Sequence, residues 1–134
     1  MAYGLHDGHI ISYEVRCFER EIELKVALAD SGSANALFLE VQGYHFKHDA
    51  FGNIISNIEE VPAAKILGLF SAEIREAFRL DGAYGIWASN METAESALNA
   101  LGTRGYLLSC SIGLDGWILA KEIIVKRTDS DSNS

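Results

Sequence analysis

The chain has 134 residues and a mass of 14.7 kDa, enough for one domain that buries its own core without a disulfide or a metal. It carries 19 acidic and 11 basic side chains, a formal net charge of −8, and 49% of its residues are hydrophobic. This charge argues against nucleic acid and against a membrane surface as partners, because both are anionic and would repel the chain. The composition is that of a globular protein.

Residues 1–11 contain no basic segment followed by an apolar run, and no stretch reaches the roughly 18 apolar residues of a membrane span. We therefore expect a cytoplasmic protein. In a reducing compartment Cys17 and Cys110 stay free thiols, and their apolar, strand-like surroundings predict that both are buried. No cofactor is expected, since no cofactor-binding motif is recognised.

The N-terminal half alternates between apolar and polar residues with a period of two, which is typical of half-buried strands. A first strand is predicted over 11–17 and a second over 21–28, paired antiparallel as a hairpin. After a polar turn, a third strand is predicted over 37–46, where the change of parity at Gly43 indicates a β-bulge. A short fourth strand is predicted over 54–58.

A helix is predicted after the only proline, Pro62, because its fixed φ and missing N–H suit the first position of a helix. Gly68 and Ser71 are expected to interrupt this helix. Its apolar side chains recur every four residues along one stripe: Ile66, Phe70, Ile74 and Phe78.

A second helix is predicted to begin at Ser89, which forms a capping-box pattern with Glu92, and to end at Gly102. Two strands over 106–112 and 117–125 then close the domain as a hairpin. Both contain consecutive apolar residues, so we expect them to be covered on both faces, in the middle of the sheet.

These elements predict an α+β fold in which two helices pack on a curved, mainly antiparallel sheet of about six strands. The predicted domain organisation is a single α+β domain over 1–127, followed by a disordered acidic and polar tail over 128–134.

The four histidines fall in two pairs three residues apart, each close to an aspartate, and loops that bring the pairs together would form a tetrahedral zinc site. However, positions three apart on a strand point to opposite faces, so ordinary loop histidines are the simpler interpretation and no metal is predicted. The zinc site is kept as an alternative. Its ligands would be His6, His9, His45 and His48.

No catalytic site is predicted, and we do not expect an enzyme. Ser109, Cys110 and Ser111 form the only segment rich in nucleophiles, but it lacks the strand-to-helix elbow of a nucleophilic serine. A structural role is the simpler interpretation of this segment.

Three segments carry a resemblance to known proteins: residues 5–8, 52–55 and 106–120. Through them and its overall type, the chain resembles the small acidic α+β proteins that bacteria encode as immunity partners of secreted or contact-delivered toxins, and related bacterial proteins. This resemblance implies a protein-binding module that inhibits a toxin. Immunity proteins bind their toxins through different surfaces, so no binding residue is transferred from the family.

The predicted function is a non-enzymatic, protein-binding immunity protein that occludes a basic toxin domain with an acidic surface, because complementary charge speeds association. The simpler interpretation of these acidic residues is that they solvate a helix and complement its dipole. The candidate partner-binding residues are four carboxylates and two aromatic anchors: Glu59, Glu60, Glu73, Glu76, Tyr44 and Trp87.

Two alternatives stay open. The first is a small-ligand-binding protein, or an enzyme, with an apolar pocket inside the curved sheet lined by Tyr13, Phe46 and Trp117. The second is a homodimer formed through an exposed edge strand, which is compatible with either function.

Overall fold

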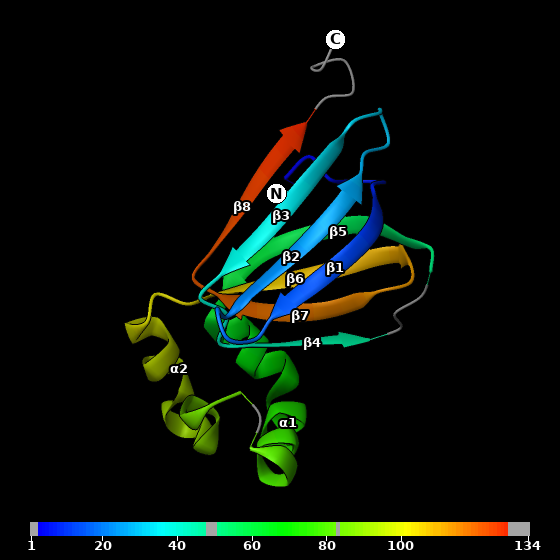
Figure 1. Ribbon diagram of the computed structural model, residues 1–134. Coiled ribbons are helices and arrows are strands. Elements are labelled where there is room, and N and C mark those ends of the chain that lie inside the picture. Colours follow the sequence, from blue (N-terminus) through cyan, green and yellow to red (C-terminus); the bar gives the residue numbers. More distant parts are fainter. Residues whose placement is uncertain (1–2, 48–50, 83, 129–134) are drawn as a thin grey trace.

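The computed structural model describes residues 3–47, 51–82 and 84–128. Within them, one antiparallel sheet carries two α-helices and a short 3₁₀ helix (Figure 1). The predicted α+β class is therefore confirmed. The predicted strand number is wrong, because the sheet has eight strands, and it is open, with β4 and β8 as its edges.

The strands are arranged in the order β4-β7-β6-β5-β1-β2-β3-β8. In chain order the elements are β1 (His9–Arg16), β2 (Glu21–Ala27), β3 (Ser33–Leu39), β4 (Gly43–Lys47), β5 (Asn53–Pro62), α1 (Ala63–Asp81), η1 (Ile86–Ser89), α2 (Met91–Ala100), β6 (Arg104–Ile112), β7 (Asp115–Ala120) and β8 (Glu122–Thr128).

The sheet folds over on itself, so that the half made of β8, β3, β2 and β1 crosses the half made of β5, β6, β7 and β4 (Figure 1). The halves are joined where β1 pairs with β5 at only two positions, His9 with Ile54 and Ile10 with Asn53. Both strands have register shifts beside this junction, and shifts of this kind bend a strand.

The main core fills the space between the two halves. Ile22, Leu24 and Val26 point into it from β2, and Tyr106 and Leu108 point into it from β6. The alternation in the N-terminal sequence follows from this arrangement, because only one face of the β1–β2 hairpin packs against the other half. The predicted hairpin is confirmed, with β1 and β2 paired antiparallel.

The two helices lie against the other face of the β5-β6-β7-β4 half, where a second apolar cluster forms (Figure 1). Ile66 and Ile74 of α1 are fully buried there, together with Trp117 and Leu119 of β7. Since β7 also contributes Ile118 to the main core, it is covered on both faces, as its apolar run predicted. No helix of the described residues is both long and apolar enough to cross a membrane.

The predicted third strand over 37–46 is in fact two strands at different places in the sheet. β3 ends before Glu40, which has a φ of +50°. The backbone N–H of Val41 then donates to a carbonyl of the β1–β2 turn (2.9 Å), and that of Gln42 donates to a carbonyl of β7 (2.7 Å). The chain thus crosses to the opposite edge, and Gly43 begins β4 instead of forming a bulge.

The predicted last strand over 117–125 is also divided. β7 ends before a bend at Lys121, and β8 then pairs with β3 at the edge of the sheet. The expected coverage on both faces is therefore confirmed for β7. The expected position in the middle of the sheet is wrong for both parts, because β7 lies next to the edge strand β4 and β8 is itself an edge. Thr128, the first residue of the predicted tail, is the last residue of β8 and pairs with Ser33 of β3. The rest of the tail, 129–134, lies outside the described residues.

The first predicted helix is confirmed as α1. Pro62 ends β5 and caps the helix with extended backbone angles, so strand and helix follow each other without a loop. The backbone of Phe70 leaves the helical region (φ −126°, ψ 18°), and the helix is kinked between Gly68 and Ser71 as predicted.

The second helix, α2, begins one residue later than predicted. Asn90 is its N-cap, and the side-chain oxygen of Asn90 accepts from the N–H of Glu92 (2.9 Å). The hydroxyl of Ser89 instead donates to the carbonyl of Ile86 in η1 (2.7 Å). Ser89 is the last residue of η1 and its hydroxyl is used within that short helix, so the next residue, Asn90, caps α2.

The end of α2 is as predicted. The N–H of Gly102 donates to the backbone carbonyl of Asn99, and the N–H of Thr103 donates to that of Leu98. Both N–O distances are 3.0 Å. This pair of hydrogen bonds is the Schellman motif, in which a residue of positive φ ends the helix.

The position of this cap can be tested by mutation. We expect Asn90→Ala to lower the free energy of unfolding by about 1 kcal/mol, because it removes the acceptor of the Glu92 N–H, which has no partner within the helix. Ser89→Ala should lower it by less. Asn90→Asp, which keeps the acceptor, is the control. Urea denaturation measures all three, and a larger cost for Ser89→Ala than for Asn90→Ala would contradict the assignment.

Candidate binding groove

The carboxylates predicted to form one acidic surface are spread over different sides of the molecule. Glu59 and Glu60 are consecutive in β5, where side chains alternate between the faces. Glu59 pairs with Leu107, which packs on the helix side, and Glu60 pairs with Tyr106, which belongs to the main core. The two carboxylates therefore face opposite sides of the sheet.

Three of these four carboxylates form ion pairs with other residues of the described part of the chain. The shortest N–O distances are 2.9 Å for Glu60 with Arg104, 3.3 Å for Glu73 with Lys47 and 2.6 Å for Glu76 with Arg79. The hydrogen bond from Arg79 also lowers the pKa of Glu76. These pairs reduce the negative field that a partner would meet at each position.

Of the two predicted aromatic anchors, only Tyr44 is accessible. Trp87 is 6% exposed, and its indole N–H donates to the carbonyl of Gln42 (3.1 Å). It fastens η1 to the segment before β4 and cannot reach a partner without leaving this position. Tyr44 is only partly buried, and it lines an open groove together with Tyr84.

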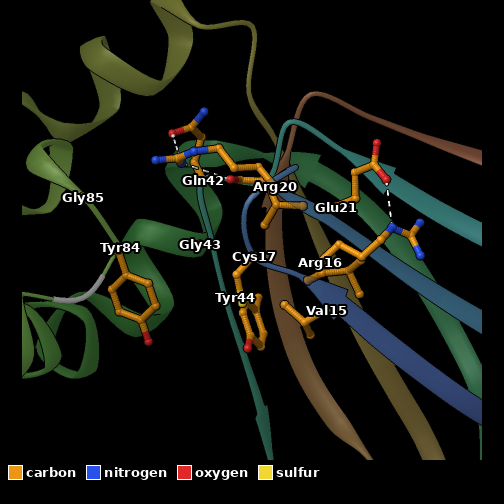
Figure 2. Close-up of a pocket in the computed structure, with 12 residues that line it drawn as sticks. Val15, Arg16, Cys17, Arg20, Glu21, Gln42, Gly43, Tyr44, Tyr84 and Gly85 are labelled. Carbon is orange, nitrogen blue, oxygen red and sulfur yellow. Dashed lines mark hydrogen bonds and ion pairs between the residues drawn. The ribbon is translucent and has the colours of Figure 1, made fainter.

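This groove, of about 280 Å³, lies between the β1–β2 turn and the start of β4. Figure 2 shows Tyr84 on one side, Tyr44 and Val15 opposite it, and Arg20 with Gln42 above. We call this feature the tyrosine groove. It combines two aromatic rings with polar groups at its rim.

Tyr84 is held by aromatic packing. Its ring stacks on Trp87 with a centroid distance of 6.1 Å and contacts Trp117 at 5.5 Å. The absence of a side chain at Gly43 makes this possible, because a Cβ atom there would lie 3.0 Å from the Tyr84 ring. Burial raises the pKa of Tyr84, and Glu73 and Tyr44 raise it further, so the hydroxyl stays protonated at neutral pH.

The influences on the pKa of Tyr84 also indicate which predicted residues lie near it. Glu73 acts on Tyr84 from α1 and Tyr44 acts on it from β4, so these two predicted partner-binding residues lie around one tyrosine. Glu76 follows on α1. None of the four predicted carboxylates lines the groove itself, and Glu59 and Glu60 belong to a different element, β5.

The rim of the groove carries two arginines with different surroundings. Arg16 forms ion pairs with Glu14 (2.9 Å), Glu21 (3.0 Å) and Glu23 (3.0 Å), which raise its pKa and leave an excess of negative charge around it. With the residues that the structure describes, Arg20 makes only long hydrogen bonds, of 3.4 and 3.5 Å, to the segment before β4. Arg20 is thus the more available cation.

A second hollow, of about 500 Å³, adjoins the groove through Tyr44 and Tyr84 and is also lined by Tyr13, His45 and Phe46. The rings of Tyr13 and Phe46 meet edge to face at 5.4 Å. Two of the three side chains predicted to line a pocket inside the sheet, Tyr13 and Phe46, thus line an open hollow instead.

The third residue predicted to line a pocket, Trp117, does not line either hollow. It is 1% exposed and packs under Phe70, with a ring distance of 5.9 Å. Both hollows lie where strands of the two sheet halves approach each other, and the interior between the halves is occupied by the main core.

The predicted histidine ligands are dispersed. His6 lies in the loop before β1 beside Asp7 (3.2 Å), His9 begins β1, and His45 lies in β4. His48 is outside the described residues. Within 3–47, 51–82 and 84–128, no three His, Cys, Asp or Glu side chains are grouped so as to hold a metal ion.

The two cysteines differ from their predicted burial. Cys17 is exposed in the β1–β2 turn, because the strand ends one residue before it, and Cys110 is partly buried. Burial, with a smaller effect of Asp115, raises the pKa of Cys110 to about 11, so its thiol is protonated at neutral pH. A protonated thiol is a poor nucleophile, which favours the structural interpretation of this segment.

Sequence reasoning did not single out Tyr84, Arg20 or Gln42. A signal was present for Tyr84, which stands in a glycine-rich turn where neither a helical nor a strand pattern explains an aromatic side chain. Arg20 and Gln42 carry no such signal, since they meet only because the chain crosses between the sheet halves.

No protein-family model matches the chain, and a search of curated proteins found no matching relative.

Proposed function

We propose that the protein is a non-enzymatic binding module that holds a segment of a basic partner protein in the tyrosine groove. The observation that carries this proposal is the pair of tyrosines, Tyr44 and Tyr84, on the two sides of an open groove. Tyrosine is enriched among the residues that dominate binding energy, because it offers a large rigid surface and a hydroxyl at low entropic cost.

Charge supports a basic partner. The chain carries a net charge of −8, and three carboxylates surround Arg16 at one end of the groove. A field of this sign accelerates association with a cationic protein. A bacterial toxin domain, occluded by its immunity protein, is the partner that the sequence resemblance favours.

Binding of a small molecule is the second candidate, and the aromatic hollow beside the groove favours it. Tyr13, Tyr44, Phe46 and Tyr84 surround a space of a size that small ligands occupy. In this case the ligand would stack on the rings, and binding would depend little on salt.

The first test is capture of partners from a lysate of the native organism, with the wild type, Tyr44→Ala and Tyr3→Ala as baits at low and high salt. Tyr3 is the matched control, because it is a partly buried tyrosine whose hydroxyl bonds to Glu60, away from the groove. We expect one stoichiometric basic protein that high salt releases, and at least a tenfold weaker affinity for Tyr44→Ala, as for a typical hot-spot residue.

Two outcomes would contradict the proposal. Equal capture by Tyr44→Ala would exclude the groove as the binding surface. A wild type without any stoichiometric partner, combined with Tyr44-dependent binding of a hydrophobic fluorescent probe, would favour the small-ligand function instead.

The acidic residues are tested on the same captured partner with two double variants. We expect Glu73→Gln/Glu76→Gln to weaken binding and its salt dependence, because Glu73 acts on Tyr84 of the groove and Glu76 follows it on α1. Glu59→Gln/Glu60→Gln is the control and should leave the affinity unchanged.

A further inference from the structure

The edge strand β8 has an open side. It pairs with β3 along its whole length, from Glu122 opposite Leu39 to Thr128 opposite Ser33, and has no other partner strand among the residues that the structure describes. The strand has seven residues and no proline. An edge of this kind presents free N–H and C=O groups and can add a further strand.

The side chains of β8 alternate between two environments. Ile123 and Val125 are partly buried and pack against the main core. Glu122, Ile124 and Lys126 alternate with them, and Ile124 lies opposite the half-buried Leu37 of β3. The open edge thus has an acidic end, an apolar centre and a basic end.

We propose that β8 pairs antiparallel with β8 of a second copy of this chain, about a twofold axis that passes by Ile124. In this register Ile124 lies opposite Ile124 of the second copy, and Ile123 lies opposite its Val125. Glu122 lies opposite its Lys126, and the twofold axis repeats this ion pair. Opposite charges and apolar pairs at facing positions both stabilise antiparallel strands.

Neighbouring registers do not match in this way. An axis at Ile123 would place Glu122 opposite Ile124 and Val125 opposite Lys121. An axis at Val125 would place Ile124 opposite Lys126 and Ile123 opposite Arg127. The axis at Ile124 is the one of the three that pairs charge with charge and apolar with apolar at every position from 122 to 126.

The ends of the paired segment are compatible with this register. Beyond the five facing positions, Lys121 would approach Arg127 of the second copy, which is a like-charge contact. Each of these cations has a carboxylate of its own chain, Glu40 for Lys121 (3.6 Å) and Asp30 for Arg127 (3.5 Å), which offsets the repulsion. Leu37 and Ile124 of both copies would then form one continuous apolar row.

A strand pair of this length makes a small interface, so we expect a reversible dimer whose population rises with protein concentration. Sedimentation velocity over a concentration series tests it with three variants: Glu122→Lys, Lys126→Glu and the double charge exchange. The single variants should be monomeric, because each places like charges opposite each other, and the double variant should dimerise as the wild type does.

A mixture of the two single variants provides the most specific test of the charge pairing. The Glu122→Lys chain carries two lysines at the facing positions and the Lys126→Glu chain carries two glutamates, so the mixture should form heterodimers although neither chain dimerises alone. Circular dichroism checks that all variants remain folded. A monomeric wild type, or single variants that dimerise as well as the wild type does, would overturn the proposal.

The register itself is tested by oxidation in a Cys17→Ser background, because Cys17 is an exposed thiol. We expect Ile124→Cys to form an intermolecular disulfide, since facing Cα atoms are close enough for one. Lys126→Cys is the matched control and should not cross-link, because in this register its counterpart lies four positions away along the strand. Cross-linking of the control and not of Ile124→Cys would overturn the register.

Discussion

Replacing Trp117 with alanine is expected to lower the free energy of unfolding by about 3–5 kcal/mol, the range found for buried large aromatic side chains. Trp117 is 1% exposed and lies between α1 and the sheet, with Phe70 at 5.9 Å and Tyr84 at 5.5 Å between ring centroids. Its removal would leave a cavity under both the helix and the tyrosine groove. Urea denaturation at constant pH measures the loss.

The matched variant is Trp117→Phe, which we expect to cost less than about half as much. The indole nitrogen of Trp117 is buried and has no hydrogen-bond partner among the described residues. Phenylalanine keeps most of the aromatic packing and removes this unsatisfied donor, whose burial itself costs about 1–3 kcal/mol. A loss for Trp117→Phe as large as that for Trp117→Ala would contradict the expectation that aromatic packing dominates at this position.

Gly116→Val is expected to detach β4 from the sheet. A Cβ atom at this position of β7 would overlap the backbone carbonyl of His45 and would lie 2.8 Å from the Phe46 ring. The backbone cannot yield without breaking the β4–β7 pairing, so we expect a loss of about 3 kcal/mol in the free energy of unfolding. Hydrogen exchange of the amides in β4 should become faster, and partner binding in the tyrosine groove should be lost.

Gly68→Ala is the control for this substitution. Gly68 is an exposed glycine in α1, and a Cβ atom there would meet nothing within 4 Å. We expect this variant to be as stable as the wild type or more stable by about 0.5–1 kcal/mol, because alanine favours a helix. If Gly116→Val kept slow exchange in β4, the close approach of β4 and β7 would not be required.

The tyrosine groove illustrates how much of a site a sequence can indicate. Tyr44 was recognised as an aromatic in a strand, and Glu73 as part of an acidic helix, but nothing in the local pattern placed them around Tyr84. Their meeting requires β4 to pair with β7, and these strands are far apart in the chain. Conversely, Glu59 and Glu60 are adjacent in sequence and yet face different sides of the sheet.

The features that the sequence alone predicts are those that depend on residues close together in the chain. Alternation over a few residues identified the β1–β2 hairpin, and a four-residue period identified the buried stripe of α1 and, through Gly68 and Ser71, its kink. The residue that ends α2 was also evident, because a Schellman motif is closed by hydrogen bonds within six residues. Each of these features needs only the local backbone and one apolar face.

The tertiary structure alone decided where strands end and which strands become edges. The segment 37–46 and the segment 117–125 each look continuous, because both halves of each are rich in apolar residues. In the fold, the N–H of Gln42 donates to β7 and the N–H of Lys121 donates to β3, and these bonds between distant segments divide the two stretches and place their parts at different positions in the sheet. Such pairings are chosen by the packing of the whole core, since any half-buried strand can pair with several others at similar local cost.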